Sequence, residues 1–114
     1  MMVTLEEKFY VGESGFYFTV QTGLSMAGAN AGDIRSVLKR PNGSIVRRTI
    51  PLTDILNGDT GETIMLVGSG DLNAPGIYRA QIWVRDTSLN RMRPSHEFRF
   101  EVLDTISNGS GIFA

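Results

Sequence analysis

The sequence predicts an all-β domain in which about seven antiparallel strands form a two-layer sandwich. Short segments alternate between apolar and polar residues, which is the period of half-buried strands. Clusters of Gly, Pro, Asn and Asp separate these segments roughly every 8–12 residues, as in β-sandwiches. The chain contains 13 glycines, and none of its segments shows a sustained helical period.

The clearest alternation lies near the C-terminal end and predicts two strands, at residues 77–86 and 95–103. In the first, one face carries Tyr78, Ala80, Ile82 and Val84, and the other carries Arg79, Gln81, Trp83 and Arg85. In the second, His96, Phe98, Phe100 and Val102 share the inward face. Residues 87–91 form the connecting loop, so the two strands are expected to pair as an antiparallel hairpin.

Five further strands are expected upstream, at residues 8–11, 16–21, 34–39, 44–50 and 62–67. The first of them is a short edge strand. The Pro41-Asn42-Gly43 segment is a strong turn signal between the third and fourth. Residues 23–32 are rich in small residues and are expected to form a loop. Residues 51–57 are expected to form a short helical turn capped by Thr53.

Composition limits the classes of function that the chain can have. Its 114 residues suit a single domain, with the sandwich at residues 1–104 and a possible docking arm at 105–114. The net charge of −1 gives no global attraction to nucleic acid or anionic membranes, and we expect neither as a partner. Cysteine is absent, which excludes disulfides. The polar, acidic start does not resemble a signal peptide, so assembly in a cytoplasm is expected.

The segment Asp71-Leu72-Asn73-Ala74-Pro75-Gly76-Ile77-Tyr78 is the most informative local pattern. It resembles the corner of immunoglobulin-like domains, where a Tyr near the start of a late strand bonds back to upstream backbone. Leu72 would then enter the core, Gly76 would help to turn the chain, and Tyr78 would brace the turn. The pattern therefore predicts an immunoglobulin-like sandwich.

A second resemblance involves the segment from Thr22 to Ala29, the strand at 34–38 and the turn Lys39-Arg40-Pro41-Asn42-Gly43-Ser44. These features, with the closing Phe98, Phe100 and Val102, are similar to the small immunoglobulin-like domains of tailed-bacteriophage virion proteins, including the N-terminal domain of baseplate upper proteins. The turn has Asn42 where that family usually has Asp, and Arg40 is inserted beside Pro41. The resemblance spans residues 15–104 and implies a structural role.

Patterns that would support catalysis or cofactor binding are weak in this sequence. His96 is the sole histidine and is expected in the core or at its rim. No His/Cys metal motif or phosphate-binding loop is present. The segments 57–62 and 68–71 contain oxygen ligands suitable for calcium, but they lack EF-hand spacing, and turns explain them better. We therefore expect neither an enzyme nor a bound cofactor, and an enzyme using His96 ranks last.

The best candidate interface is the polar face of the final hairpin, together with the chain end. A Trp among arginines is typical of an interface anchor. An alternative is that arginine stems cover the Trp, or that the register is shifted by one residue. The apolar end of the tail is expected to dock on a neighbouring subunit. The candidate residues are Arg79, Gln81, Trp83, Arg85, Arg99, Ile112 and Phe113.

Two functions of different classes follow. The first is a non-enzymatic phage virion component, in the tail, baseplate or capsid decoration, that binds other virion proteins or copies of itself and is located in the virion. The second is a carbohydrate-binding or adhesion module in which Trp83 and Tyr17 stack on sugar rings.

Overall fold

A computed structural model describes residues 8–86 and 89–106 of the chain. The described part is an all-β sandwich of two sheets with nine strands and one turn of 3₁₀ helix. The elements, in chain order, are β1 (Phe9–Tyr10), β2 (Phe16–Gln21), β3 (Ile34–Lys39), β4 (Ile45–Thr49), η1 (Leu52–Asp54), β5 (Ile55–Asn57), β6 (Glu62–Val67), β7 (Gly76–Asp86), β8 (Arg91–Pro94) and β9 (Phe98–Leu103).

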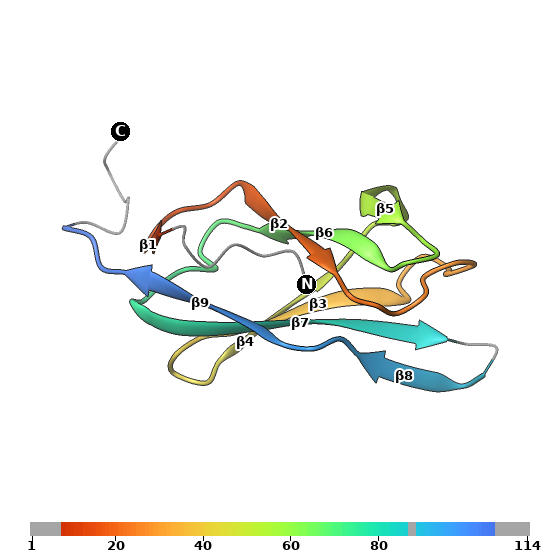
Figure 1. Cartoon of the computed structure of the whole chain (residues 1–114). Helices are drawn as coiled ribbons and strands as arrows, with labels where there is room; N and C mark the ends of the chain where they lie inside the picture. Colours follow the sequence, from red (N-terminus) through yellow and green to blue (C-terminus); the bar gives the residue numbers. More distant parts are fainter. Residues whose placement is uncertain (1–7, 87–88, 107–114) are drawn as a thin grey trace.

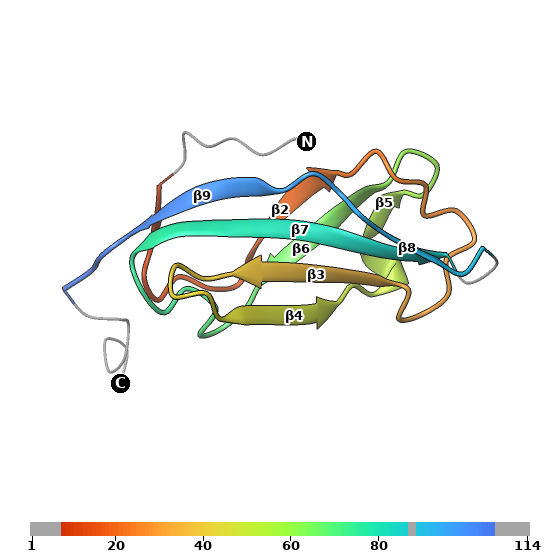
Figure 2. The ribbon, with the colours of Figure 1, turned by 90° about the horizontal axis from the view of Figure 1, so that it is seen from below.

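The larger sheet has the order β1-β9-β7-β3-β4, with β8 pairing along the far end of β7, and the smaller sheet has the order β2-β6-β5. Figure 1 shows the two layers edge-on, and Figure 2 looks onto the outer face of the larger sheet. This arrangement is an immunoglobulin-like sandwich, with the Tyr-bearing strand β7 central in its sheet. The longest strand, β7, has 11 residues and therefore positions side chains along the whole face.

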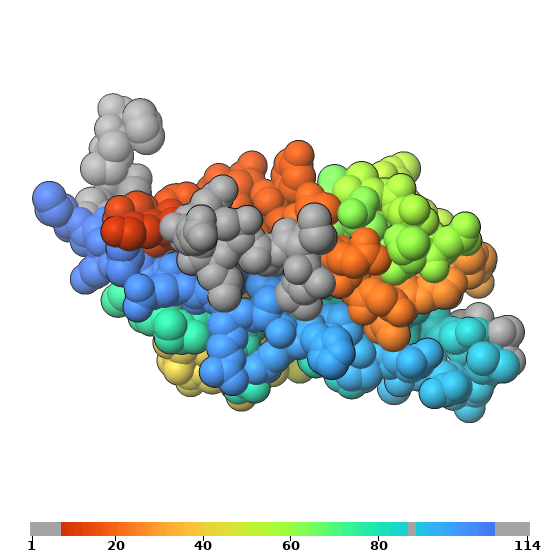
Figure 3. Space-filling view, in the orientation of Figure 1, coloured from red at the N-terminus to blue at the C-terminus, as the bar shows by residue number. Residues whose placement is uncertain are grey.

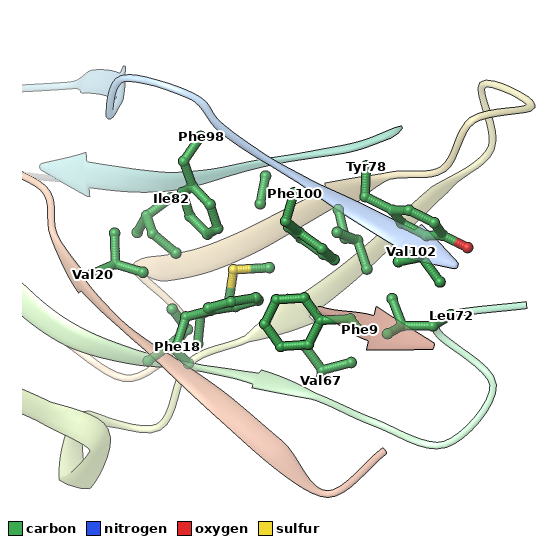
Figure 4. Packing of buried hydrophobic residues seen from close by; sticks show 14 of the residues in the cluster. Phe9, Phe18, Val20, Val67, Leu72, Tyr78, Ile82, Phe98, Phe100 and Val102 are labelled. Atoms are coloured by element: carbon green, nitrogen blue, oxygen red, sulfur yellow. The ribbon is translucent and has the colours of Figure 1, made fainter. Parts of the chain in front are cut away.

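The core lies between the sheets and is filled by the inward residues of most strands, whereas β8 is exposed throughout (Figure 4). Four phenylalanines are buried in it, and Phe18 packs against Phe9, Phe98 and Phe100 at ring-centroid distances of 5.0–5.4 Å. The predicted inward residues of β7, from Tyr78 to Val84, are all buried. The predicted alternation in β2, β3 and β7 is therefore confirmed.

The predicted corner is present and closes the entry to β7. The Tyr78 hydroxyl donates to the carbonyl oxygen of Ala74 at 2.7 Å and accepts from the Ala74 N–H at 3.2 Å. Leu72 is buried in the core, as expected. Gly76 has a φ of 133°, and a Cβ there would lie 2.7 Å from Cγ of Pro41. Gly76 therefore allows the β3–β4 turn to pack against the corner.

Three predictions about the strands need correction. The described residues form nine strands instead of about seven, because β5 and β8 were not expected as separate strands. The predicted edge strand β1 exists but pairs with β9 in a parallel register, so the sandwich is not purely antiparallel. The expected helical turn at 51–57 is limited to η1, where Thr53 does not act as the cap. Residues 55–57 instead form β5, which pairs with β6.

His96 was expected to face inward with Phe98, and this is wrong because the edge beside β7 contains a β-bulge. Trp83 pairs with Pro94, whereas Ala80 pairs with Phe98, so the register shifts by one residue between β8 and β9. Ser95 is buried at this point, and its Oγ accepts from the Ile82 N–H at 3.0 Å. The extra residue turns His96 to the exposed surface.

Candidate functional site

A hollow of about 540 Å³ lies on the outer face of the larger sheet. Three of the predicted interface residues, Arg79, Gln81 and Trp83, line it from the central strand β7. Apolar side chains form much of its surface, and charged side chains surround them. The other lining residues are Arg35, Val37, Lys39, Ala80, Ile45, Arg47, Met92 and Glu97.

The hydrogen-bond register of β3 and β7 determines which side chains meet in this hollow. Arg35 lies opposite Trp83, and Val37 lies opposite Gln81. On the other side of β3, Arg47 of β4 lies opposite Val37. Because side chains opposite one another in paired strands point to the same face, these residues project from one surface. Trp83 remains 36% exposed, so the sheet covers only part of its ring.

Glu97 provides the negative charge at this hollow, and two arginines hold it. Arg79 donates to Oε2 through Nη2 at 2.7 Å, and Arg99 donates to Oε1 at 3.0 Å. The hydrogen bond from Arg79, followed by that from Arg99, lowers the pKa of Glu97 below its ordinary value. Arg99 thus reaches the site through Glu97 and does not itself line the hollow.

Arg85 does not line the hollow and instead binds Asp33 in the loop before β3. Its Nε donates to Oδ1 of Asp33 at 3.0 Å, although these residues are 52 positions apart in the sequence. The Asp33 side chain is buried, and the backbone N–H of Asn30 donates to its Oδ2 at 3.0 Å. The Asn30 hydrogen bond and the Arg85 pair lower the pKa of Asp33. Arg85 therefore anchors the loop before β3 as well as bordering the site.

The contribution of β3, β4 and β8 to this surface was not predicted from the sequence. Val37, Ile45 and Met92 supply apolar area beside Trp83, and Arg47 supplies charge. The alternation within each strand was visible in the sequence, but the order of strands in the sheet was not. Tyr17, expected to act with Trp83, lies on β2 of the smaller sheet, so the two aromatic rings occupy opposite sides of the sandwich. Ile112 and Phe113 lie outside the described residues.

The loops that offered calcium ligands have internal hydrogen bonds instead. The Asn57 Oδ1 accepts from the backbone N–H groups of Asp59 and Thr60 at 3.1 and 3.2 Å. The Asp71 carboxylate accepts from Arg48 and from the Gly68 N–H. Over residues 8–86 and 89–106, no group of three or more His, Cys, Asp and Glu is placed to hold a metal ion.

Comparison of the chain with models of known protein families, with characterised proteins and with solved structures found no match. In the described part of the chain, no helix is long and apolar enough to cross a bilayer. The site must therefore be interpreted from its own chemistry. A half-exposed Trp in a hollow with apolar walls and a charged rim is suited to binding another surface, since binding would exclude water from the ring.

Proposed function

We propose that this domain is a non-enzymatic structural component of a tailed-bacteriophage particle, part of the tail or baseplate or a capsid decoration protein. Its outer sheet face would be the docking surface for a neighbouring virion protein or another copy of the chain. The observation that carries the docking role is the position of Trp83 in a hollow with Val37, Ile45 and Met92. The resemblance of the turn at 39–44 and of the closing strand supports the virion role.

The expected energetics are those of a small interface with one central anchor. Covering the exposed 36% of Trp83 would contribute about 2 kcal/mol at roughly 25 cal/mol per Å² of apolar area. Arg79 and Glu97 already pair with each other, so they enter an interface with their charges largely compensated. Met92 is 71% exposed and adds flexible apolar area that can adapt to a partner.

The test is whether the chain is incorporated into particles through this face. Particles would be purified by density gradient from cells producing the phage, and the protein would be quantified by mass spectrometry. We expect the wild-type chain in a fixed ratio to the other particle proteins and strong depletion of Trp83→Glu. Leu89→Ser, which removes an exposed apolar side chain of the β7–β8 connection, serves as the control. Finding the chain only as a free monomer, with none in particles, would refute the proposal.

A second candidate is a carbohydrate-binding module, which the same Trp83 favours. An exposed indole beside Gln81 and Glu97 offers a stacking surface with polar groups at its edge. The position of Tyr17 on the other sheet excludes the two-ring platform, so Trp83 would have to stack alone. Calorimetric titration with a panel of oligosaccharides tests this candidate. Binding that disappears in Trp83→Ala would support it, and absence of heat with every sugar would reject it.

A further inference from the structure

Charge is distributed unequally between the two sheets. The outer face of the larger sheet, seen in Figure 2, carries six basic side chains but only two acidic ones. The basic residues are Arg35, Lys39, Arg47, Arg79, Arg85 and Arg99, and the acidic residues are Glu97 and Glu101. This face therefore has a net positive charge even with Glu97 shared by Arg79 and Arg99 and Arg85 paired with Asp33, although the whole chain has a net charge of −1.

The smaller sheet and its connections carry negative charge instead. Residues 9–33 and 49–78, which include β2, η1, β5 and β6, contain no Lys or Arg. Glu62 lies on β6, Asp54 ends η1, and Asp59 lies in the β5–β6 turn. Figure 3 looks at the edge of the sandwich, with residues of β2 and β5 along its upper part and residues of β8 and β9 along its lower part. The layers thus form a basic and an acidic side of one sandwich.

Both sides also expose large apolar side chains. On the smaller sheet and its connection, the exposed ones are Tyr17, Leu52, Leu56 and Leu66. On the larger sheet they are Tyr10, Ile45, Ile77, Trp83 and Met92. Tyr17 lies directly opposite Leu66 in the β2–β6 pair, so their side chains form one apolar patch. Apolar side chains clustered on a sheet face indicate a surface that becomes covered.

From this complementarity we infer that the occupant of the basic face is the acidic face of a second copy of the same chain. This inference rests on the proposed role as an assembly component and names its partner. Opposite charges would surround two apolar patches that exclude water together. Pairing of two basic faces would instead bring Arg35, Lys39 and Arg47 of one copy close to the same residues of the other, and like charges disfavour that contact.

The contact is heterologous, because different surfaces of the two copies meet. The two faces lie on opposite sides of one sandwich, so each bound copy presents a free face to the next. Association of this kind continues into a ring if the rotation between copies closes, and into a filament if it does not. Repeating rings and filaments of one small domain are architectures suited to a particle component.

Two single substitutions on exposed residues test the inference. Trp83→Glu places a negative charge on the basic face, and Leu66→Lys places a positive charge on the acidic face, so each disables one side of the contact. Circular dichroism and thermal melting would establish that each variant folds. Sedimentation velocity would follow self-association of the wild type and of each variant up to millimolar concentration. We expect the wild type to associate in low salt and to weaken in about 1 M salt, where charges are screened beyond about 3 Å. Each variant alone should show at least a tenfold weaker association.

The mixture of the two variants is decisive. Leu66→Lys keeps an intact basic face, and Trp83→Glu keeps an intact acidic face, so an equimolar mixture should form a one-to-one dimer and nothing larger. Self-association that survives in Leu66→Lys alone, or a mixture that stays monomeric while the wild type associates, would overturn the inference. A wild type that remains monomeric at every concentration would also overturn it. Incorporation into particles through Trp83 would still stand in that case, since it is measured separately.

Discussion

Arg48 and Asp71 form a bidentate ion pair that connects the two layers of the sandwich. Nη2 of Arg48 lies 2.7 Å from Oδ1 of Asp71, and Nε lies 3.2 Å from Oδ2. The Asp71 side chain is only 5% exposed, and the Gly68 N–H donates to its Oδ2 at 2.8 Å. The pair thus fixes the chain as it leaves β6 of the smaller sheet and approaches β7 of the larger one.

Removing the Asp71 carboxylate should therefore destabilise the domain. Asp71→Ala leaves the Gly68 N–H without its acceptor and Arg48 without its partner, and we expect a loss of about 2 kcal/mol in the free energy of unfolding. Arg48 is 38% exposed and can be rehydrated, which keeps the loss below that of a fully buried pair. Urea unfolding measures the change. Asp59→Ala, in an exposed turn, should stay within about 0.5 kcal/mol, and an equal loss in both variants would contradict this assignment.

The contribution of the Tyr78 hydroxyl to stability can be measured by removing its oxygen atom. Tyr78→Phe keeps the buried ring, which stacks on Phe100 at a centroid distance of 5.5 Å, and deletes only the hydrogen bonds to Ala74. We expect a loss of about 1–2 kcal/mol, measured as a lower urea midpoint with an unchanged m-value. Tyr17→Phe removes the same atom from an exposed ring and should leave the midpoint unchanged. A Tyr78→Phe variant with the same urea midpoint as the wild type would show that the corner does not depend on this hydroxyl.

Features that depend on neighbouring residues could be predicted from the sequence. The corner is of this kind, because Tyr78 bonds to Ala74 only four positions away. The inward face of β7 is another, because a period of two places every second side chain on one face. The Pro41-Asn42-Gly43 turn also forms as expected, and the Gly43 N–H donates to the Arg40 carbonyl oxygen at 2.9 Å.

Features that depend on strand order could not be predicted from local pattern. The hollow needs β3 and β4 beside β7, and nothing in the alternation of β3 identifies its neighbours. The Arg48–Asp71 pair spans 23 positions, and neither residue differs locally from a solvated surface charge. His96 was misplaced because a one-residue bulge between β8 and β9 interrupts the alternation there. Ser95 is buried in place of His96, whereas Phe98, Phe100 and Val102 keep the predicted inward face.

Gly76 offers a test of close packing at the corner. Gly76→Ala would place a Cβ 2.7 Å from Pro41 Cγ, in a backbone conformation that side chains rarely adopt. Gly43→Ala has a similarly positive φ of 90° but meets nothing within 4 Å, so it reports backbone strain alone. We expect Gly76→Ala to lower the free energy of unfolding by at least about 1 kcal/mol more than Gly43→Ala does. Equal losses would mean that Pro41 moves away freely.

The Asp33 carboxylate should contribute to the pH dependence of stability. Hydrogen bonds from Asn30 and Arg85 lower its pKa in the folded state, so the folded protein holds this proton less tightly than the unfolded chain. Its stabilisation is therefore present above the unfolded pKa of about 3.9 and is lost as the pH falls through the lower folded value. Glu97 has a lowered pKa for the same kind of reason and adds to the same acid-side loss.

Asp33→Asn separates these two contributions, because the amide cannot ionise. The variant should be less stable than the wild type at neutral pH and should lose less stability on acidification, so that the two curves converge in acid. Urea midpoints from neutral pH down to about pH 2 measure this, with Glu97→Gln as the exposed comparison. Added salt should diminish the Glu97 effect more than the Asp33 effect, because the Asp33 carboxylate is 3% exposed and that of Glu97 is 32% exposed. Parallel curves for wild type and Asp33→Asn would show that Asp33 does not contribute to the acid dependence.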